Sequence, residues 1–210
     1  MGFQDALNSV ASGGMIYVYR AGSAVPYEIT QALHNTGNGQ VVWFESTAVI
    51  LNKITQGSAG DGASIIYPFS NTTYPSGGPQ GAPTAGYANC YWVGNGASIN
   101  GNNVATNVAV QVNVNGPLNG GTTVAYDCEF GGFNLANITG GGLTCVCANG
   151  HGSTPTDLQT NHNIRFYQIT ATFSSTAVSS NSGIPCGVNS CNRILFEDLD
   201  FDCSAYPSVD

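Results

Sequence analysis

Three aspartates late in the chain have the side-chain chemistry and the spacing of a candidate cation site. Asp198, Asp200 and Asp202 alternate with apolar residues, so a strand through them would direct all three carboxylates to one face. Several hard oxygen ligands of this kind suit Ca²⁺, and Glu197 lies beside them. The same alternation is typical of a solvated strand face whose charges prevent edge-to-edge pairing. Ca²⁺ binding is therefore one of two interpretations of this row, and we expect no other cofactor.

Aromatic side chains in two apolar runs could form a platform for sugars. Tyr91 and Trp92 begin one of these runs, and Trp43 lies in the other. Large rings with a polar atom suit contacts with a glycan or with a protein surface. Apolar neighbours on both sides also fit burial in the core or between subunits. Tyr91 and Trp92 are therefore candidate glycan-binding residues, with core packing as the alternative.

Two similar segments, 163–171 and 192–201, define the elements that would position these residues. Their apolar residues recur at every second position within each half of the segment, the period of a strand with one buried face. They are Ile164, Phe166, Ile169 and Ala171 in the first segment and Ile194, Phe196, Leu199 and Phe201 in the second. Between the halves the phase slips by one residue, as at a corner after which the strand still faces inward. A bent strand that recurs about 30 residues later is typical of a solenoid.

This pattern resembles the right-handed parallel β-helix of the pectin-lyase-like superfamily, which includes polysaccharide hydrolases, lyases and viral tailspikes. The resemblance implies an all-β fold of successive parallel strands, in which similar residues lie above one another. Further strands are expected at 48–54, 91–93, 108–114, 124–130 and 143–147. An antiparallel jelly roll or β-sandwich also fits strands of this length and is the alternative.

An internal repeat in the first 45 residues supports this fold. A shift of 26 residues places the apolar strand 15–18 on the apolar strand 41–44. We expect a short helix before each strand, because the apolar residues of 3–10 share one helical face and Pro26 suits a helix start. The unit is similar to the helix that covers the first coil in the pectin-lyase-like superfamily.

The predicted organisation is a single solenoid with two parts. Residues 1–54 form the N-terminal helix-strand repeat that caps it, and residues 55–210 form its coils. Residues 71–89, rich in Pro, Gly, Thr and Ser, are expected to form a long surface loop. No second amphipathic helix follows the last predicted strand, so the final coil should be covered by a symmetry mate, another subunit or a further segment.

A second resemblance concerns catalysis. Asp127 precedes the Gly-His-Gly element around His151 by a little over twenty residues, as an aspartate pair precedes such an element in polygalacturonases. The resemblance implies that Asp127 is a catalytic acid, His151 its supporting neighbour and Arg193 a contact for a uronate carboxylate. Tyr126 stands in place of the first aspartate of the pair, whereas glycoside hydrolysis normally needs two carboxylates.

Composition narrows the possible partners. Four Lys and Arg against twelve Asp and Glu, with a net charge of -8, argue against a nucleic-acid partner. No run approaches the length of a membrane span, and the first residues do not have the form of a signal peptide. A surface with so few charges fits burial between subunits, which predicts a homo-oligomer or a larger assembly.

Seven cysteines are an odd number for a disulfide framework. Cys186 and Cys191 bracket a four-residue loop and could pair, whereas Cys145 and Cys147 alternate along a strand and should share a face. Buried free thiols are the other interpretation.

These observations predict a non-enzymatic structural or receptor- or glycan-binding β-helix subunit of a virion or an extracellular filament. The alternative is a polygalacturonase-like glycoside hydrolase that acts on an acidic polysaccharide. The two hypotheses differ in whether Asp127 acts as an acid.

Overall fold

The computed structural model describes residues 2–20, 25–54, 64–71, 85–104, 108–115, 122–148, 159–174 and 186–204. A short helix, α1 (Phe3–Ser9), precedes the strands. These are β1 (Met15–Val18), β2 (Tyr27–Ile29), β3 (Leu33–His34), β4 (Val41–Phe44), β5 (Val49–Asn52), β6 (Ile66–Tyr67), β7 (Tyr91–Asn100), β8 (Val108–Asn115), β9 (Tyr126–Ile138), β10 (Gly141–Ala148), β11 (His162–Phe173), β12 (Cys186–Asn189) and β13 (Asn192–Asp202). Within these ranges, no helix is long and apolar enough to cross a membrane.

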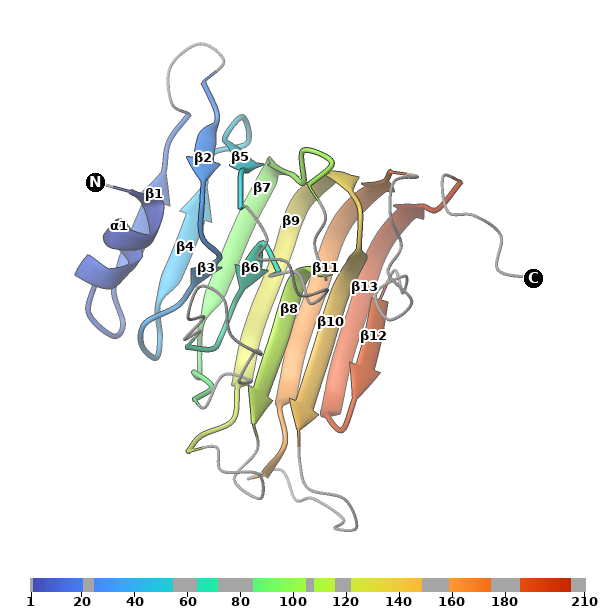
Figure 1. Cartoon of the computed structure of the whole chain (residues 1–210). Coiled ribbons are helices and arrows are strands. Elements are labelled where there is room, and N and C mark those ends of the chain that lie inside the picture. Colours follow the sequence, from blue (N-terminus) through green and yellow to red (C-terminus); the bar gives the residue numbers. More distant parts are fainter. Residues whose placement is uncertain are drawn as a thin grey trace.

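The strands form an eight-stranded and a five-stranded sheet. The longer sheet has the order β1-β4-β7-β9-β11-β13, with β5 on β7 and β2 on β5, and the shorter one has the order β12-β10-β8-β6-β3. From β7 onward the chain alternates between the two sheets, and strands of one sheet lie side by side in sequence order from blue to red (Figure 1). All pairs between named strands are parallel. The predicted all-β fold with parallel strands is therefore confirmed, and the antiparallel alternative is wrong.

The strand registers match the two sequence alignments. Ile164 and Phe166 in β11 face Ile194 and Phe196 in β13. Met15 in β1 faces Val41 in β4, as the shift of 26 residues predicted. The alternation of apolar residues therefore determined the register, because a slip by one residue would turn the apolar face to solvent.

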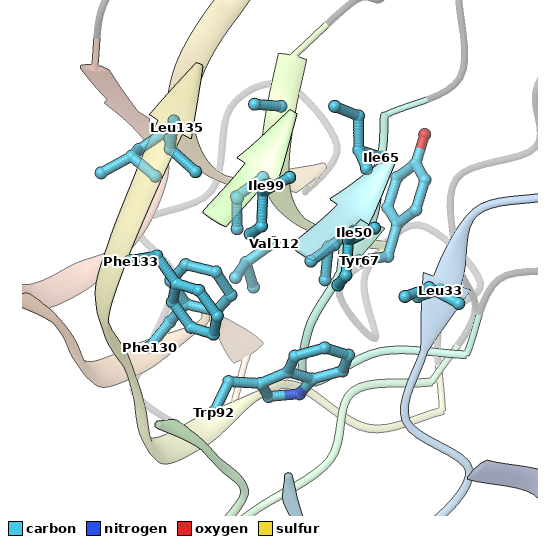
Figure 2. Packing of buried hydrophobic residues seen from close by; sticks show 14 of the residues in the cluster. Leu33, Ile50, Ile65, Tyr67, Trp92, Ile99, Val112, Phe130, Phe133 and Leu135 are labelled. Atoms are coloured by element: carbon cyan, nitrogen blue, oxygen red, sulfur yellow. The ribbon is translucent and has the colours of Figure 1, made fainter. Parts of the chain in front are cut away.

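Residues at one register position of the longer sheet form a column of inward side chains: Ile16, Val42, Trp92, Phe130, Phe166 and Phe196. The Trp92 and Phe130 rings lie 6.2 Å apart, and those of Phe130 and Phe166 lie 6.4 Å apart. Figure 2 shows Trp92 and Phe130 with Val112 of the shorter sheet in the same buried cluster. The core therefore lies between the sheets, and each strand buries its apolar residues on those of the strand before it.

Residues with left-handed backbone form the two corners of the bent strands. Gly132, Gln168 and Asp198 have φ values of 74°, 50° and 52°, at the point where the sequence phase slips. A second set lies within two residues of the strand starts, at equivalent positions of successive strands: Gly13, Gly39, Asn89, Asp127, Asn163 and Arg193. Positive φ is least costly for Gly, Asn and Asp, which are five of these six residues.

Helix α1 lies next to β1 at one end of the longer sheet (Figure 1). Leu7 is fully buried, and the Phe3 ring stacks on Phe44 at 5.9 Å. The Gln4 side chain donates to the His34 carbonyl at 3.1 Å and accepts from the His34 N–H at 2.9 Å. The first predicted helix is therefore confirmed, and it packs on the core through Leu7 and Phe3.

The second predicted helix, after Pro26, is wrong. Residues 27–29 and 33–34 are strands β2 and β3, which pair with β5 and β6. Leu33 is buried, and its neighbour in the shorter sheet is Ile66. Pairing with later strands therefore outweighed a local helical pattern that offered only a weak preference.

The longer sheet continues from β4 and β5 into β7, so both predicted parts, 1–54 and 55–210, contribute to it. Of the predicted loop 71–89, residues 72–84 lie outside the described residues. Ala85 and Ala88 form isolated parallel bridges to Thr123 and Tyr126. The end of that segment therefore already lies beside the start of β9.

Candidate functional site

The structure aligns two of the three predicted catalytic residues at equivalent positions of β9 and β13, with β11 between them. Asp127 and Arg193 lie on either side of Asn163 in the corner where the backbone is left-handed. The Asn163 amide donates to Asp127 Oδ1 at 2.8 Å, and Arg193 Nε donates to Asn163 Oδ1. His151 lies outside the described residues. Asp127, Asn163 and Arg193, which we call the polar ladder, follow each other across three strands.

The polar ladder offers one carboxylate, one amide and one guanidinium group. Glu129, the next carboxylate along β9, lies 3.5 Å from Arg165 and is therefore part of a different cluster. Cleavage of a glycosidic bond needs a second carboxyl group across the bond from the first. The hydrogen bond from Asn163 to Asp127 joins β9 to β11 at a corner that favours Asp or Asn.

Trp92 does not belong to a surface site, and its assignment as a glycan-binding residue is wrong. Its side chain is fully buried, and its indole Nε1 donates to Asn35 Oδ1 at 2.7 Å. Tyr91, the preceding residue, points the other way and is half-buried. Neighbouring residues of a strand face opposite sides, so only one of this pair could reach solvent.

The side of the longer sheet opposite the core carries two rows of side chains, which we call the outer face. In register order, the first row is Met15, Val41, Tyr91, Glu129, Arg165 and Leu195. The second row is Tyr17, Trp43, Val93, Gly131, Tyr167 and Glu197. The outer face is therefore apolar and aromatic over β1 and β4 and charged over β9, β11 and β13.

The apolar part of the outer face exposes large side chains. The exposed fractions are 62% for Met15, 45% for Tyr17 and 38% for Trp43. The rings of Tyr17 and Tyr19 lie 4.5 Å apart. Tyr17 also lines a cavity of about 190 Å³ beneath α1, together with Phe3. Sequence reasoning favoured burial of Trp43 in the core or between subunits, because apolar residues surround it on both sides.

The charged part of the outer face is a closed cluster around Arg165. Its guanidinium group lies 2.8 Å from Glu197 Oε2 and 3.5 Å from Glu129 Oε2, and it covers the Tyr167 ring at 4.4 Å. The hydrogen bond that Arg165 donates to Glu197 raises the pKa of Arg165. Burial and, to a smaller extent, the charge of Glu129 raise the pKa of Tyr167. Two carboxylates against one guanidinium leave this part of the face with an excess of negative charge.

The three predicted Ca²⁺ ligands do not form a cluster. Asp198 lies at a corner, whereas Asp200 and Asp202 follow on the exposed side of β13. The Ser204 N–H donates to Asp202 Oδ1 at 2.9 Å, and the hydrogen bonds from Ser204 lower the pKa of Asp202. Among the described residues, no group of three or more His, Cys, Asp or Glu is placed to hold a metal ion. These contacts favour the solvated strand face, which was the other interpretation of the row.

The C-terminal end of the longer sheet has an incompletely covered apolar surface. Ile194, Phe196, Leu199 and Phe201 of β13, which we call the end surface, pack on the core but are only half-buried. Their neighbours in β11 are no more than 2% exposed: Ile164, Phe166, Ile169 and Ala171. In the described part of the chain, no strand pairs with the outer edge of β13. The sequence periodicity predicted that these four residues share the inward face of a strand, and their packing on the core confirms it.

No family model matches the chain, and searches of the curated proteins and of the solved structures find no match either. The outer face and the end surface are therefore the features of the described residues that bear on function.

Proposed function

We propose that the chain is a non-enzymatic structural subunit, a right-handed parallel β-helix of the pectin-lyase-like type, in a virion or an extracellular filament. Parallel strands that alternate between two sheets, with like residues in register, support this fold. The single observation that carries the function is the end surface, where apolar side chains lie half-covered along β13, whose outer edge pairs with no strand among the described residues. Surfaces of this kind normally need a partner.

A second copy of the chain is the partner that fits the end surface. The opposite end is already covered by α1, whose exposed side chains include Asp5, Asn8 and Ser9. Head-to-tail stacking would place an apolar surface on this polar helix. Contact between two end surfaces buries apolar residues on both sides and closes the assembly with two-fold symmetry. Such a pair could in turn be the unit of a larger particle.

Light scattering tests this contact. The wild-type protein should be oligomeric at micromolar concentration, and Phe196→Lys should weaken association by about tenfold or more, since burial of one phenylalanine contributes about 1.5–3 kcal/mol. Leu195→Lys is the matched control, because it adds the same charge one residue away on the outer face. A monomeric wild-type protein, or an equal loss in Leu195→Lys, would contradict the proposal. Circular dichroism of both variants checks that they fold.

The outer face supports a second role, the binding of a surface glycan. Tyr17 and Trp43 are register neighbours with exposed rings, and Met15 extends this apolar area. Aromatic rings in such a row can stack on sugar rings. The negative charge around Glu129 and Glu197 disfavours acidic glycans, so the chemistry of this face suits neutral sugars. Trp43 therefore takes the place of Trp92 as the central residue of the proposed glycan site.

A glycan array with neutral and acidic members tests this role. Trp43→Ala should weaken binding of the neutral glycans by about tenfold or more, because one stacking platform is lost. Tyr126→Ala is the control: Tyr126 has the same exposed fraction, 38%, but stacks on His162 away from Trp43. The glycan role fails if no array member binds, or if the two variants lose affinity equally.

A further inference from the structure

Two cysteines from different parts of the chain bring their sulfur atoms into contact. Cys145 lies in β10 of the shorter sheet, and Cys191 lies in the connection that leads into β13. Their Sγ atoms are 3.5 Å apart, although 46 residues separate them in the sequence. Cys191 Sγ also lies 3.4 Å from the Cys145 carbonyl oxygen. Both cysteines are free thiols in this structure.

The two thiols differ in their access to solvent. Cys145 is fully buried, whereas Cys191 is half-exposed. The neighbouring Cys191 and burial raise the pKa of the Cys145 thiol well above its ordinary value. A second close contact between cysteines, from the Cys90 N–H to Cys128 Sγ at 3.4 Å, joins two residues that are both buried. An oxidant in solution can therefore reach the first pair through Cys191 but has no comparable route to the second.

We propose that Cys145 and Cys191 are a disulfide-forming site that reacts with small-molecule disulfides. The Cys191 thiolate attacks one sulfur of the oxidant, which breaks the S–S bond of the oxidant and releases one small thiol. The Cys145 sulfur then loses its proton to solvent and attacks Cys191 Sγ, which releases the second small thiol. The protein gives up two electrons and two protons, and the oxidant takes up both.

Cys191 reacts in the first step because solvent reaches it. Cys145 reacts in the second step because its sulfur lies beside Cys191 Sγ. A buried thiol with a raised pKa carries little thiolate at neutral pH, so ring closure should be the slower step and should accelerate as the pH rises. The product would join β10 to the start of β13, which carries the end surface. The site is independent of the proposed assembly and glycan roles.

Peptide mapping by mass spectrometry after incubation of the folded protein with oxidised glutathione tests the site. We expect a cross-linked peptide pair that contains Cys145 and Cys191 and a mass two hydrogens lower than that of the reduced protein. Cys145→Ser should stop at the mixed disulfide on Cys191. Cys186→Ser is the matched control and should leave the cross-link unchanged. Closure of a long loop should raise the melting temperature by about 5 °C or more.

Two results would overturn the proposal. One is a cross-link between Cys186 and Cys191, the pair that short sequence spacing favours. The other is failure of the folded protein to form any Cys145–Cys191 cross-link while glutathione still modifies Cys191. Light scattering of the same samples reports the assembly separately, so loss of one result does not imply loss of the other.

Discussion

Phe130→Ala should lower the free energy of unfolding by about 3–5 kcal/mol. The Phe130 side chain is fully buried, and its ring lies 4.6 Å from Phe133 and 6.2 Å from Trp92. Phe130 lies in the middle of the column of inward side chains of the longer sheet, which we call the inner column. Loss of its ring therefore opens a cavity between paired strands. The remaining rings cannot close this cavity without shifting the strand register. Urea unfolding followed by tryptophan fluorescence measures the change.

Tyr126→Ala is the control for this measurement. Tyr126 belongs to the same strand, β9, and also stacks on an aromatic ring, that of His162 at 5.2 Å. Its ring is partly solvated, so its loss should lower the free energy of unfolding by less than about 1 kcal/mol. Similar losses in the two variants would contradict the view that the inner column carries the stability of the stack.

Asn35→Ala should lower the free energy of unfolding by about 3 kcal/mol although it removes only a small polar group. Asn35 is fully buried, and its Oδ1 accepts from Trp92 Nε1 at 2.7 Å and from the Phe69 N–H at 3.2 Å. Its amide nitrogen donates to Gln40 Oε1 at 3.2 Å. Alanine would leave the buried Trp92 and Phe69 N–H groups without this hydrogen-bond acceptor. Neither group would then recover the hydration free energy that it lost on burial.

Two comparisons separate this effect from a general loss of side-chain contacts. Asn134→Ala also removes a hydrogen-bonded asparagine side chain, which donates to the Gly96 carbonyl at 2.8 Å, but at an exposed position. It should lower the free energy of unfolding by less than about 1 kcal/mol. In a double-mutant cycle, Trp92→Phe should cost less in the Asn35→Ala background than in the wild type. Additive losses would show that the Trp92–Asn35 hydrogen bond contributes little.

The sequence predicted the positions of the candidate functional residues with different success. Asp127 and Arg193 were chosen by resemblance, and the fold does align them, but through Asn163 and a corner that the resemblance did not include. Asp198, Asp200 and Asp202 were correctly assigned to a strand. Their separation at a corner and along an exposed edge follows from a backbone bend, and a count of alternating residues does not reveal how far apart carboxylates end up.

The sequence by itself determined the strands and much of their register. Apolar residues at every second position, with β-branched and aromatic side chains, leave few ways to bury one face, and the phase slip at Gln168 and Asp198 marked the corner. Repeated patterns such as 15–18 and 41–44 specified which strands become neighbours, because like residues stack best on like. The half-covered surface of β13 follows from the same pattern.

Only the tertiary structure decided which aromatic residues face solvent and which thiols meet. Trp43 and Trp92 both lie in apolar runs, and a strand with apolar residues on both faces does not tell which face is the core. Their orientations follow from pairing with β1, β7 and β9, in which Trp92 shares the inner column with Phe130 while Trp43 lies beside Tyr17. Cys145 and Cys191 meet for the same reason, since contact between sheets depends on pairings far apart in the chain.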